Sequence, residues 1–272
     1  MSMPTDRRQT ERVREQFTRT AEVFGDYSIA HRLGDAEMLA RIVRAGTTES
    51  ALDVACGPGT LALRFSRHVR SICGLDLTPA ILERARLAAA AEGLGNLFFA
   101  LGDAQALPFA DGSLDIAVTS YSLHHMPDPA GVIREMARVV KPGGRVGVID
   151  IRVPENAQVA QMSNRIERIR DASHIRTLAR SEFGAMFAAA GLHVFASEMR
   201  RDPRQFDNWM HVAGWHRGDR EYIEARGLLE STIPDNSAGF DPQWALADPG
   251  GSSEEPDIQF MHTILYVAAE KP

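Results

Sequence analysis

The sequence predicts an α/β protein with a doubly wound, mostly parallel sheet, and three observations support this fold class. From residue 50 to 151, short apolar runs alternate with longer helical runs. Glycine and proline mark the boundaries between them, as at Pro79 and at Gly143-Gly144. The first apolar run ends in Asp53 and a glycine turn at Gly57 and Gly59, as the opening of a βαβ unit does. Right-handed crossovers then place helices on both faces of the sheet.

The N-terminal residues predict helices rather than strands. Apolar residues recur at helical spacing among Arg, Glu and Gln, first at Val13, Phe17, Ala21 and Phe24, then at Met38, Leu39, Ile42 and Val43. The second run ends before Gly46. Neither run is long enough to be a domain. We therefore expect residues 1–46 to form a helical lid on a main domain of residues 47–272.

The main domain begins with five strand-like runs separated by helices. The predicted strands are residues 51–55, 71–75, 97–101, 114–119 and 145–151. The predicted helices between them are residues 61–68, 79–91 and 130–140. The alternation is typical of parallel strands joined by crossover helices.

After residue 151 the pattern changes. Residues 154–180 are rich in Arg and predict a helical insertion after the fifth strand. A helix at 181–190, a strand at 192–199 and helices at 206–215 and 221–230 follow, and residues 232–257 are typical of a long loop. The run at 259–268 predicts a last strand, so two final strands are expected at one edge of the sheet.

Composition excludes several classes of protein. The chain has 272 residues and a net charge of −6, which argues against a protein that grips nucleic-acid backbone. No run of about 18 apolar residues is present, so no membrane-spanning helix is expected. The start lacks the apolar core of a signal peptide, and Cys56 and Cys73 are too few for a disulfide framework or zinc cluster. We expect a cytoplasmic protein without a metal.

The glycine turn predicts a nucleotide-type cofactor site and leaves two ligands open. Asp76 follows Gly57 by nineteen residues, as in a dinucleotide site, so an NAD(P)-dependent oxidoreductase is one alternative. A turn without any ligand is another. Asp53 favours a different ligand, because a carboxylate aimed at the turn would repel a pyrophosphate and suit an ammonium group.

Two further strand ends carry polar residues suited to a nucleoside. Asp103, after the third strand, can accept a hydrogen bond from an adenine amine. Ser120 opens a turn with His124 and His125 at the end of the fourth strand. Open α/β sheets bind ligands at these carboxyl ends.

The motifs at residues 52–59, 74–76, 102–104 with 107–109, 123–128 and 138–145 resemble the class I S-adenosylmethionine-dependent methyltransferases, in particular the ubiquinone/menaquinone-biosynthesis-type subgroup. The resemblance implies a Rossmann-like sheet of seven strands in the order 3-2-1-4-5-7-6, with the last strand antiparallel. It implies S-adenosyl-L-methionine as cofactor and S-adenosyl-L-homocysteine as product. The family often has Gly where Ala55 stands.

The resemblance also implies residue roles. Asp53 and the turn at Ala55, Gly57 and Gly59 would hold the methionine part. Asp76 would bind the ribose hydroxyls, with Leu77 beside it. The adenine would lie against Gly102, Asp103 and Ala104, and Ser120 would lie near the sulfonium. Tyr27 could close over the sulfonium by a cation–π contact, although lid packing explains it equally well.

Three histidines are candidates for a general base: His124, His125 and His174. The first two could instead cap the next segment or pack under the cofactor. Arg170 and Arg176 could bind an acceptor carboxylate or phosphate. Alternatively, a solvated helix face balanced by Glu167 and Asp171 would contain Arg165, Arg168, Arg170 and Arg180. The resemblance makes residues 154–180 and 203–258 acceptor-site additions. Further candidates for acceptor binding are His31, between the two N-terminal helices, and Trp209, although a Trp at helical spacing is more often a core residue.

The function predicted is methyl transfer to a small-molecule acceptor at oxygen, nitrogen or activated carbon, by in-line displacement assisted by a His base. No Asn-Pro-Pro-Tyr-type motif follows the fourth strand, which argues against base or glutamine methylation. Besides the oxidoreductase, a non-catalytic S-adenosylmethionine-binding protein is an alternative. We expect no nucleic-acid partner and no membrane span, and the sequence is compatible with a homodimer.

Overall fold

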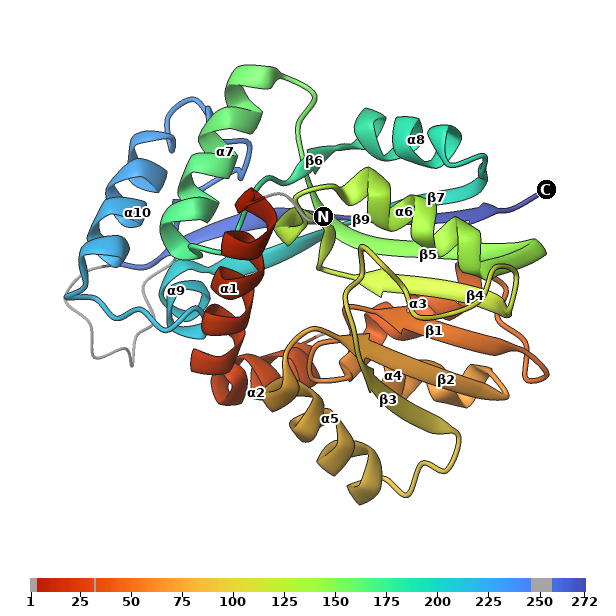
Figure 1. The fold of residues 1–272 in the computed structure, drawn as a ribbon. Helices are drawn as coiled ribbons and strands as arrows, with labels where there is room; N and C mark the ends of the chain where they lie inside the picture. Colours follow the sequence, from red (N-terminus) through yellow and green to blue (C-terminus); the bar gives the residue numbers. More distant parts are fainter. Residues whose placement is uncertain (1–3, 32, 246–255) are drawn as a thin grey trace.

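One twisted sheet organises the part of the chain that the computed structural model describes, residues 4–31, 33–245 and 256–272, the side chains of 4–7, 29–31 and 33 excepted. Its strands are β1 Ser50–Val54, β2 Ser71–Asp76, β3 Leu97–Leu101, β4 Leu114–Ser120, β5 Val140–Val153, β6 Leu178–Ala179, β7 His193–Gln205, β8 Gln243–Trp244 and β9 Ile258–Glu270. Figure 1 shows one sheet with the strand order β3-β2-β1-β4-β5-β9-β7. The short strand β6 pairs with β5, and β8 pairs with β9.

The predicted strand order is confirmed. Strands β1 to β5 pair in parallel, while β9 runs antiparallel to both β5 and β7. β1 is central because it is apolar and four of its five residues are buried, as a strand covered on both faces requires. Taken as the seven principal strands, the order is 3-2-1-4-5-7-6 with the last strand antiparallel.

Helices cover both faces of this sheet. They are α1 Pro4–Arg19, α2 Ala21–His31, α3 Leu33–Ile42, α4 Thr60–Phe65, α5 Pro79–Ala91, α6 Pro129–Val139, α7 Ala157–Arg170, α8 Arg180–Ala189, α9 Phe206–Val212 and α10 Arg220–Ser231. One apolar cluster joins α3 and α4 to one sheet face, and another joins α6 and α8 to the opposite face. A third cluster joins α7, α9 and α10 beside the first residues of β9. In Figure 1, α1 stands across the ends of the strands where these helices gather.

Three predicted boundaries differ from the structure. β5 begins at Val140 instead of residue 145, because Val140 already pairs with Leu114 beyond a bulge. β7 continues past residue 199 to Gln205; it tolerates Pro203 because it is an edge strand. The predicted helix over 154–180 is wrong after Arg170. There Asp171 accepts bonds from the amide and hydroxyl of Ser173, which turns the chain out of the helix.

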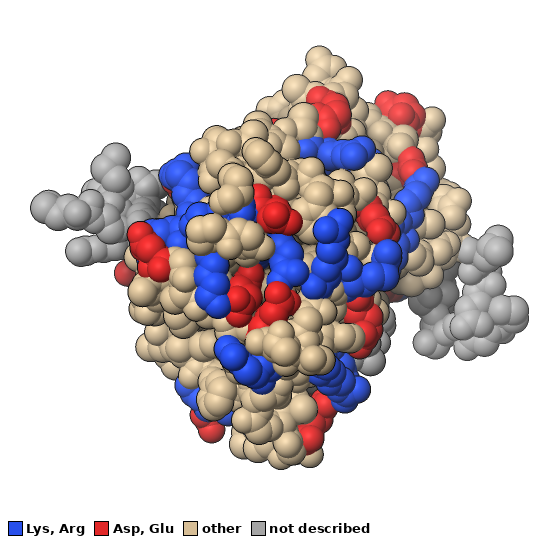
Figure 2. Space-filling view, turned by 90° about the vertical axis from the view of Figure 1, so that its right-hand side faces the viewer, with Lys and Arg blue, Asp and Glu red and all other residues tan. Residues whose placement is uncertain are grey.

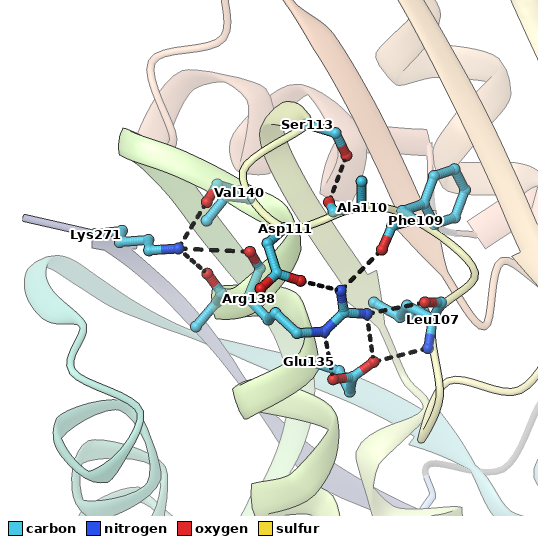
Figure 3. Close-up of polar contacts among 10 residues, drawn as sticks. Leu107, Phe109, Ala110, Asp111, Ser113, Glu135, Arg138, Val140 and Lys271 are labelled. Carbon is cyan, nitrogen blue, oxygen red and sulfur yellow. Dashed lines mark hydrogen bonds and ion pairs between the residues drawn. The ribbon is translucent and has the colours of Figure 1, made fainter.

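Arg138 on α6 fastens the loop that follows β3, as Figure 3 shows. Its guanidinium donates to the carbonyls of Leu107 (2.9 Å) and Phe109 (2.8 Å) and to the carboxylates of Asp111 and Glu135. Glu135 in turn accepts from the Leu107 amide at 2.9 Å. This fork of bonds fixes the path of the loop, and therefore the residues just before it, at the end of the sheet.

The visible surface is mixed in charge. Figure 2 shows Lys and Arg side chains interspersed with Asp and Glu on the face it presents. Among the residues described, no helix combines the length and the apolar character needed to cross a membrane.

Gly147 in β5 allows α3 to approach the sheet closely, which yields a stability prediction. A Cβ at residue 147 would lie 2.6 Å from Cγ1 of Val43 and 3.0 Å from Cδ1 of Leu39. Gly147→Ala should therefore lower the free energy of unfolding by about 1–3 kcal/mol, measured by urea denaturation. Gly184→Ala, in the exposed middle of α8 with open space around it, should instead raise it by about 0.5–1 kcal/mol. Equal effects at the two positions would contradict the packing explanation.

Candidate active site

A cleft lies at the carboxyl ends of β1 to β4, covered by α1 and α2. Its walls come from the turns after these strands and from the apolar side chains of Val13, Phe17 and Phe24. We call it the glycine-turn cleft and define it by Ala55, Gly57, Leu77, Asp76, Gly102, Asp103, Ala104 and Ser120, all of which line it. These are eight of the predicted cofactor residues, brought together because parallel strands end at one edge.

The glycine turn between β1 and α4 has an unusual backbone. Ala55, Gly57 and Gly59 all have positive φ, at 56°, 53° and 80°. A Cβ on Gly57 would meet nothing within 4 Å, so this backbone is open to a ligand. Gly59 does not line the cleft; a Cβ there would lie 3.1 Å from Ala85. Gly57 therefore shapes the cleft, whereas Gly59 lets α4 pack.

Asp76 at the end of β2 braces this turn. Its carboxylate accepts bonds from the amides of Gly57 (2.8 Å) and Thr78 (2.9 Å). Burial raises the pKa of Asp76, and these amide bonds oppose the rise. Each oxygen keeps a further lone pair, so Asp76 can still accept bonds from a ligand's hydroxyls.

Asp53 lies near the end of β1, just before the turn, and is fully buried. It is 0% exposed, does not line the cleft, and neither carboxylate oxygen has a hydrogen-bond partner among the residues described. Burial, aided by the charge of Asp76, raises the pKa of Asp53 well above its ordinary value, and the Ala62 amide opposes this only in part. An unpaired buried carboxyl is costly, so this position suits a cationic group brought by a ligand.

The loop after β3 presents Asp103 to the cleft in a fixed position. The Asp103 carboxylate accepts the amide of Gln105 at 2.9 Å, and the backbone forms a bridge to Ala106. Asp103 lines the cleft, and Arg138 holds the residues that follow it through the Leu107 carbonyl.

A second hollow adjoins the glycine-turn cleft. We call it the histidine cavity and define it by Tyr27, His124, Glu167, Arg170, His174, Arg204, Trp209 and His262. Phe17, Phe24, Tyr121 and His125 line both spaces and form the partition between them. The Phe17 ring meets Phe24 and His125 edge to face, each with centroids 5.2 Å apart.

His124 is held by a buried acid from β5. Its Nδ1 lies 2.6 Å from Oδ1 of Asp150, and the Leu123 amide donates to the other Asp150 oxygen at 3.0 Å. A carboxylate can only accept, so Nδ1 carries the proton and Nε2 is the basic nitrogen. Burial alone would lower the pKa of His124, but Asp150, with help from Glu167 and Asp171, raises it above the ordinary value.

The other two histidines are poor bases. His125 Nδ1 lies 3.1 Å from the Ser173 hydroxyl, whose own proton goes to Asp171, so His125 donates. Burial and the neighbouring His124 lower the pKa of His125 to about 4. His174 donates from Nε2 to Asn164 at 3.0 Å, and burial lowers its pKa to about 3. Both rings are therefore neutral near pH 7.

The far wall of the histidine cavity is charged. An oxygen of the Glu167 carboxylate lies 3.0 Å from Nε2 of His262, close enough for an ion pair, but the angle between the groups does not suit a hydrogen bond. The other Glu167 oxygen lies 3.9 Å from Nη1 of Arg170. Burial would raise the pKa of Glu167, but His262 and Arg170 lower it to about 2. Arg170 lies over the Trp209 ring at 4.7 Å and donates to the Trp209 carbonyl at 3.0 Å.

A chain of polar contacts links the two spaces. Asp35, which lines the glycine-turn cleft, accepts bonds from Tyr121 and Arg200, both at 2.7 Å. Arg200 also donates to Asp202 at 3.0 Å, and Asp202 contacts Arg204 in the histidine cavity.

Some predicted site residues lie elsewhere. Tyr27 and Trp209 line the histidine cavity, not the glycine-turn cleft, and Trp209 also belongs to the third apolar cluster. Arg176 lies on the surface, where it pairs with both oxygens of Glu182 at 2.7 and 3.0 Å. The side chain of His31, at the end of α2, falls outside the described residues.

Sequence reasoning missed four residues: Asp150, Glu167, Arg204 and His262. Asp150 had a signal, because an acid inside an apolar strand near its carboxyl end repeats the pattern of Asp53. No sequence signal marked Glu167, Arg204 or His262. Glu167 resembles a charged residue on a solvated helix face, and Arg204 and His262 come together only because β7 pairs with β9. Among the described residues, no group of three or more His, Cys, Asp or Glu could hold a metal ion.

Comparison with known proteins agrees with this geometry. The family described as "Methyltransferase domain" matches residues 52–148. The chain is 33% identical over 198 residues to the uncharacterized methyltransferase YcgJ of Bacillus subtilis, covering 73% of this chain and 78% of that protein. It is 32% identical to 27-O-demethylrifamycin SV methyltransferase of Amycolatopsis mediterranei, covering 67% and 68%. The crystal structure of YcgJ superposes with a TM-score of 0.77 at 28% identity, covering 88% and 99%.

Ala55 provides a test of the backbone at the glycine turn. An alanine at φ 56° is strained by about 1–2 kcal/mol, a cost that glycine does not bear. Ala55→Gly should therefore raise the free energy of unfolding by about 0.5–1 kcal/mol in urea denaturation, after the greater unfolded-state entropy of glycine is subtracted. As a control, Ala185→Gly on exposed α8 should lower it by a similar amount. Destabilisation at both positions would contradict the assigned backbone.

Proposed function

Because the chain belongs to the S-adenosylmethionine-dependent methyltransferases, we propose that it methylates a small-molecule acceptor bound in the histidine cavity, with His124 as general base. The observation that carries the proposal is the shared partition between the two spaces. A donor in the glycine-turn cleft and an acceptor in the histidine cavity would meet at Tyr121 and His125.

The residues of the glycine-turn cleft suit the cofactor. Asp53 would compensate the methionine ammonium, since its buried carboxyl has no partner of its own. Asp76 would accept from the ribose hydroxyls, and Asp103 with Ala104 would hold the adenine. Ser120, at the end of β4, would lie near the sulfur. This assignment accounts for a costly buried acid that the fold itself leaves unpaired.

The chain's contribution to the reaction is mainly positional. When bound, the cofactor supplies an electrophilic sulfonium methyl group for in-line displacement. The two spaces fix the direction of approach, and such fixed geometry replaces a bimolecular encounter. The edge-to-face rings of Phe17 and His125 make the partition apolar, which keeps water from competing with the acceptor.

Among the histidines, the electrostatics favour His124 as the base. Asp150 fixes its tautomer and raises its pKa, whereas His125 and His174 bind their protons too weakly. His125 and His174 are positioning residues in this proposal. Family membership removes the NAD(P)-dependent alternative, and a binding protein without chemistry would have no use for the His124–Asp150 pair.

Asp53→Asn separates cofactor binding from stability. Because the folded-state pKa of Asp53 is raised, the protonated form stabilises the fold below pH about 4, and this stability is lost as pH rises through the folded pKa. The variant should therefore melt at the same or a higher temperature than wild type at pH 8. S-adenosylhomocysteine should raise that melting temperature less, with at least tenfold weaker affinity by calorimetry.

Asp115→Asn is the matched control, since its acid lies at the start of β4 and does not line the cleft. Burial alone would raise the pKa of Asp115, but Lys141 and Ser50 lower it to about 2. Asp115→Asn should lower the melting temperature at pH 7, and the difference from wild type should shrink as the pH falls below 4. The affinity for S-adenosylhomocysteine should stay unchanged. Unaltered affinity in Asp53→Asn would refute the ammonium contact.

His124 is tested by substitution and by titration. His124→Gln should lower turnover about 10²- to 10⁴-fold, measured by labelled methyl transfer to a panel of phenols, acids and amines, with unchanged product affinity. His174→Gln should lower turnover by a smaller factor. The wild-type rate should rise as pH increases through the His124 pKa, because only the neutral ring accepts a proton.

The Asp150 contact is read by NMR without any acceptor. In Asp150→Asn the imidazole resonance of His124 should titrate at lower pH than in wild type, because the acid that raises its pKa is gone. The acid limb of turnover should move in the same direction. Full turnover in His124→Gln would exclude this residue as base.

A further inference from the structure

We propose that the methyl acceptor carries a carboxylate that binds Arg204, and that this carboxylate is an anchor and not the methylated group. The inference rests on the proposed function and specifies the class of its acceptor. It follows from Arg204, which lines the histidine cavity and has a buried Nε without a hydrogen-bond partner among the described residues.

Arg204 is a buried guanidinium with an unsatisfied donor. Its side chain is 11% exposed, and its Nε has no hydrogen-bond partner among the residues described. Nη2 contacts Asp202, but that carboxylate is shared with Arg200. Burial lowers the pKa of Arg204 to about 10. A charged donor left unpaired in this way is costly, and an incoming anion would satisfy it.

The Tyr27 ring lies against the guanidinium of Arg204. Cζ of Arg204 lies 5.6 Å from the centre of the Tyr27 ring, in a cation–π contact with α2. Stacking of this kind leaves the edge of the guanidinium, which carries Nε and Nη, for a planar partner. A carboxylate matches that edge in geometry and charge.

The other charges of the histidine cavity already have partners. Arg170 is committed to Trp209 and lies near Glu167, and Glu167 is also beside His262. Asp171 accepts from Ser173. An acceptor carboxylate can therefore bind Arg204 without breaking an existing pair. A phosphate would bring a second negative charge toward Glu167 and Asp171, so the singly charged group fits better.

The position of Arg204 determines what the carboxylate does. Arg204 lines the histidine cavity and not the glycine-turn cleft, so a group bound to it lies away from the donor. The partition residues line both spaces, and His124 lines the histidine cavity together with Arg204. The nucleophile would therefore be another atom of the acceptor, and the product would keep its carboxylate. Phe17, Phe24 and Val212 in the wall favour an apolar body.

The test compares matched ligands on the full chain saturated with S-adenosylhomocysteine. Benzoate, phenylacetate and hexanoate are each paired with the primary amide, and phenyl phosphate is added. We expect at least one carboxylate to raise the melting temperature and bind in calorimetry about 10- to 100-fold more tightly than its amide. Amides that bind as well as all three acids would overturn the proposal, as would phenyl phosphate binding tenfold more tightly than benzoate.

Arg204→Gln should abolish the preference for acid over amide and leave S-adenosylhomocysteine affinity within twofold of wild type. Arg176→Gln is the control, because that arginine pairs with Glu182 on the surface, and it should change neither. A preserved preference in Arg204→Gln would assign the carboxylate to another residue. If Arg204→Gln does not fold, the wild-type comparison decides alone. Absent product binding would instead refute the proposed function, so the two failures are distinguishable.

Discussion

Parallel pairing of β1 with β2 and β4 is the constraint on which the rest of the structure depends. It brings the carboxyl ends of four strands to one edge, so that Asp53, Asp76, Asp103 and Ser120 converge from distant parts of the sequence. Beyond β5 the sheet continues with β9, which pairs antiparallel with both β5 and β7. The later helices α7, α9 and α10 pack together there, and residues of α7 and α9 line a second space beside the first.

Most of the buried charges around the two spaces have a partner, and two groups beside these spaces carry atoms that have none among the described residues. Asp150 is paired with His124, Asp35 collects bonds from Tyr121 and Arg200, and Glu167 lies between His262 and Arg170. Charges removed from water need such partners, since desolvation otherwise exceeds the gain from folding. The Asp53 carboxyl and the Arg204 Nε lack them. The Asp53 carboxyl is acidic and belongs with the glycine-turn cleft, whereas the Arg204 guanidinium is basic and lines the histidine cavity. A cationic methyl donor in the cleft and an anionic acceptor in the cavity would supply the missing partners.

Much of the donor half was predictable because it depends on local sequence. Strand ends, the glycine turn and the acids that follow them are short-range signals, and they assembled as the alternation of strands and helices predicted. The acceptor half was less predictable because it depends on packing over long distances. His124 and His174 were recognised as candidates, but the partners that decide their basicity, Asp150 and Asn164, come from separate elements. The end of α7 was overestimated because the turn at Asp171 depends on one side-chain contact that periodicity does not register.

The two spaces are lined by largely different parts of the sequence. Among the described residues, the glycine-turn cleft has no lining residue beyond residue 127, whereas nearly all the charged wall of the histidine cavity comes from beyond residue 150. The two halves meet at four side chains, two of them from α1 and α2. A lineage can therefore vary its C-terminal residues and change the molecule it modifies, while it inherits the machinery for the methyl donor intact. Divergence in one half need not be matched by divergence in the other.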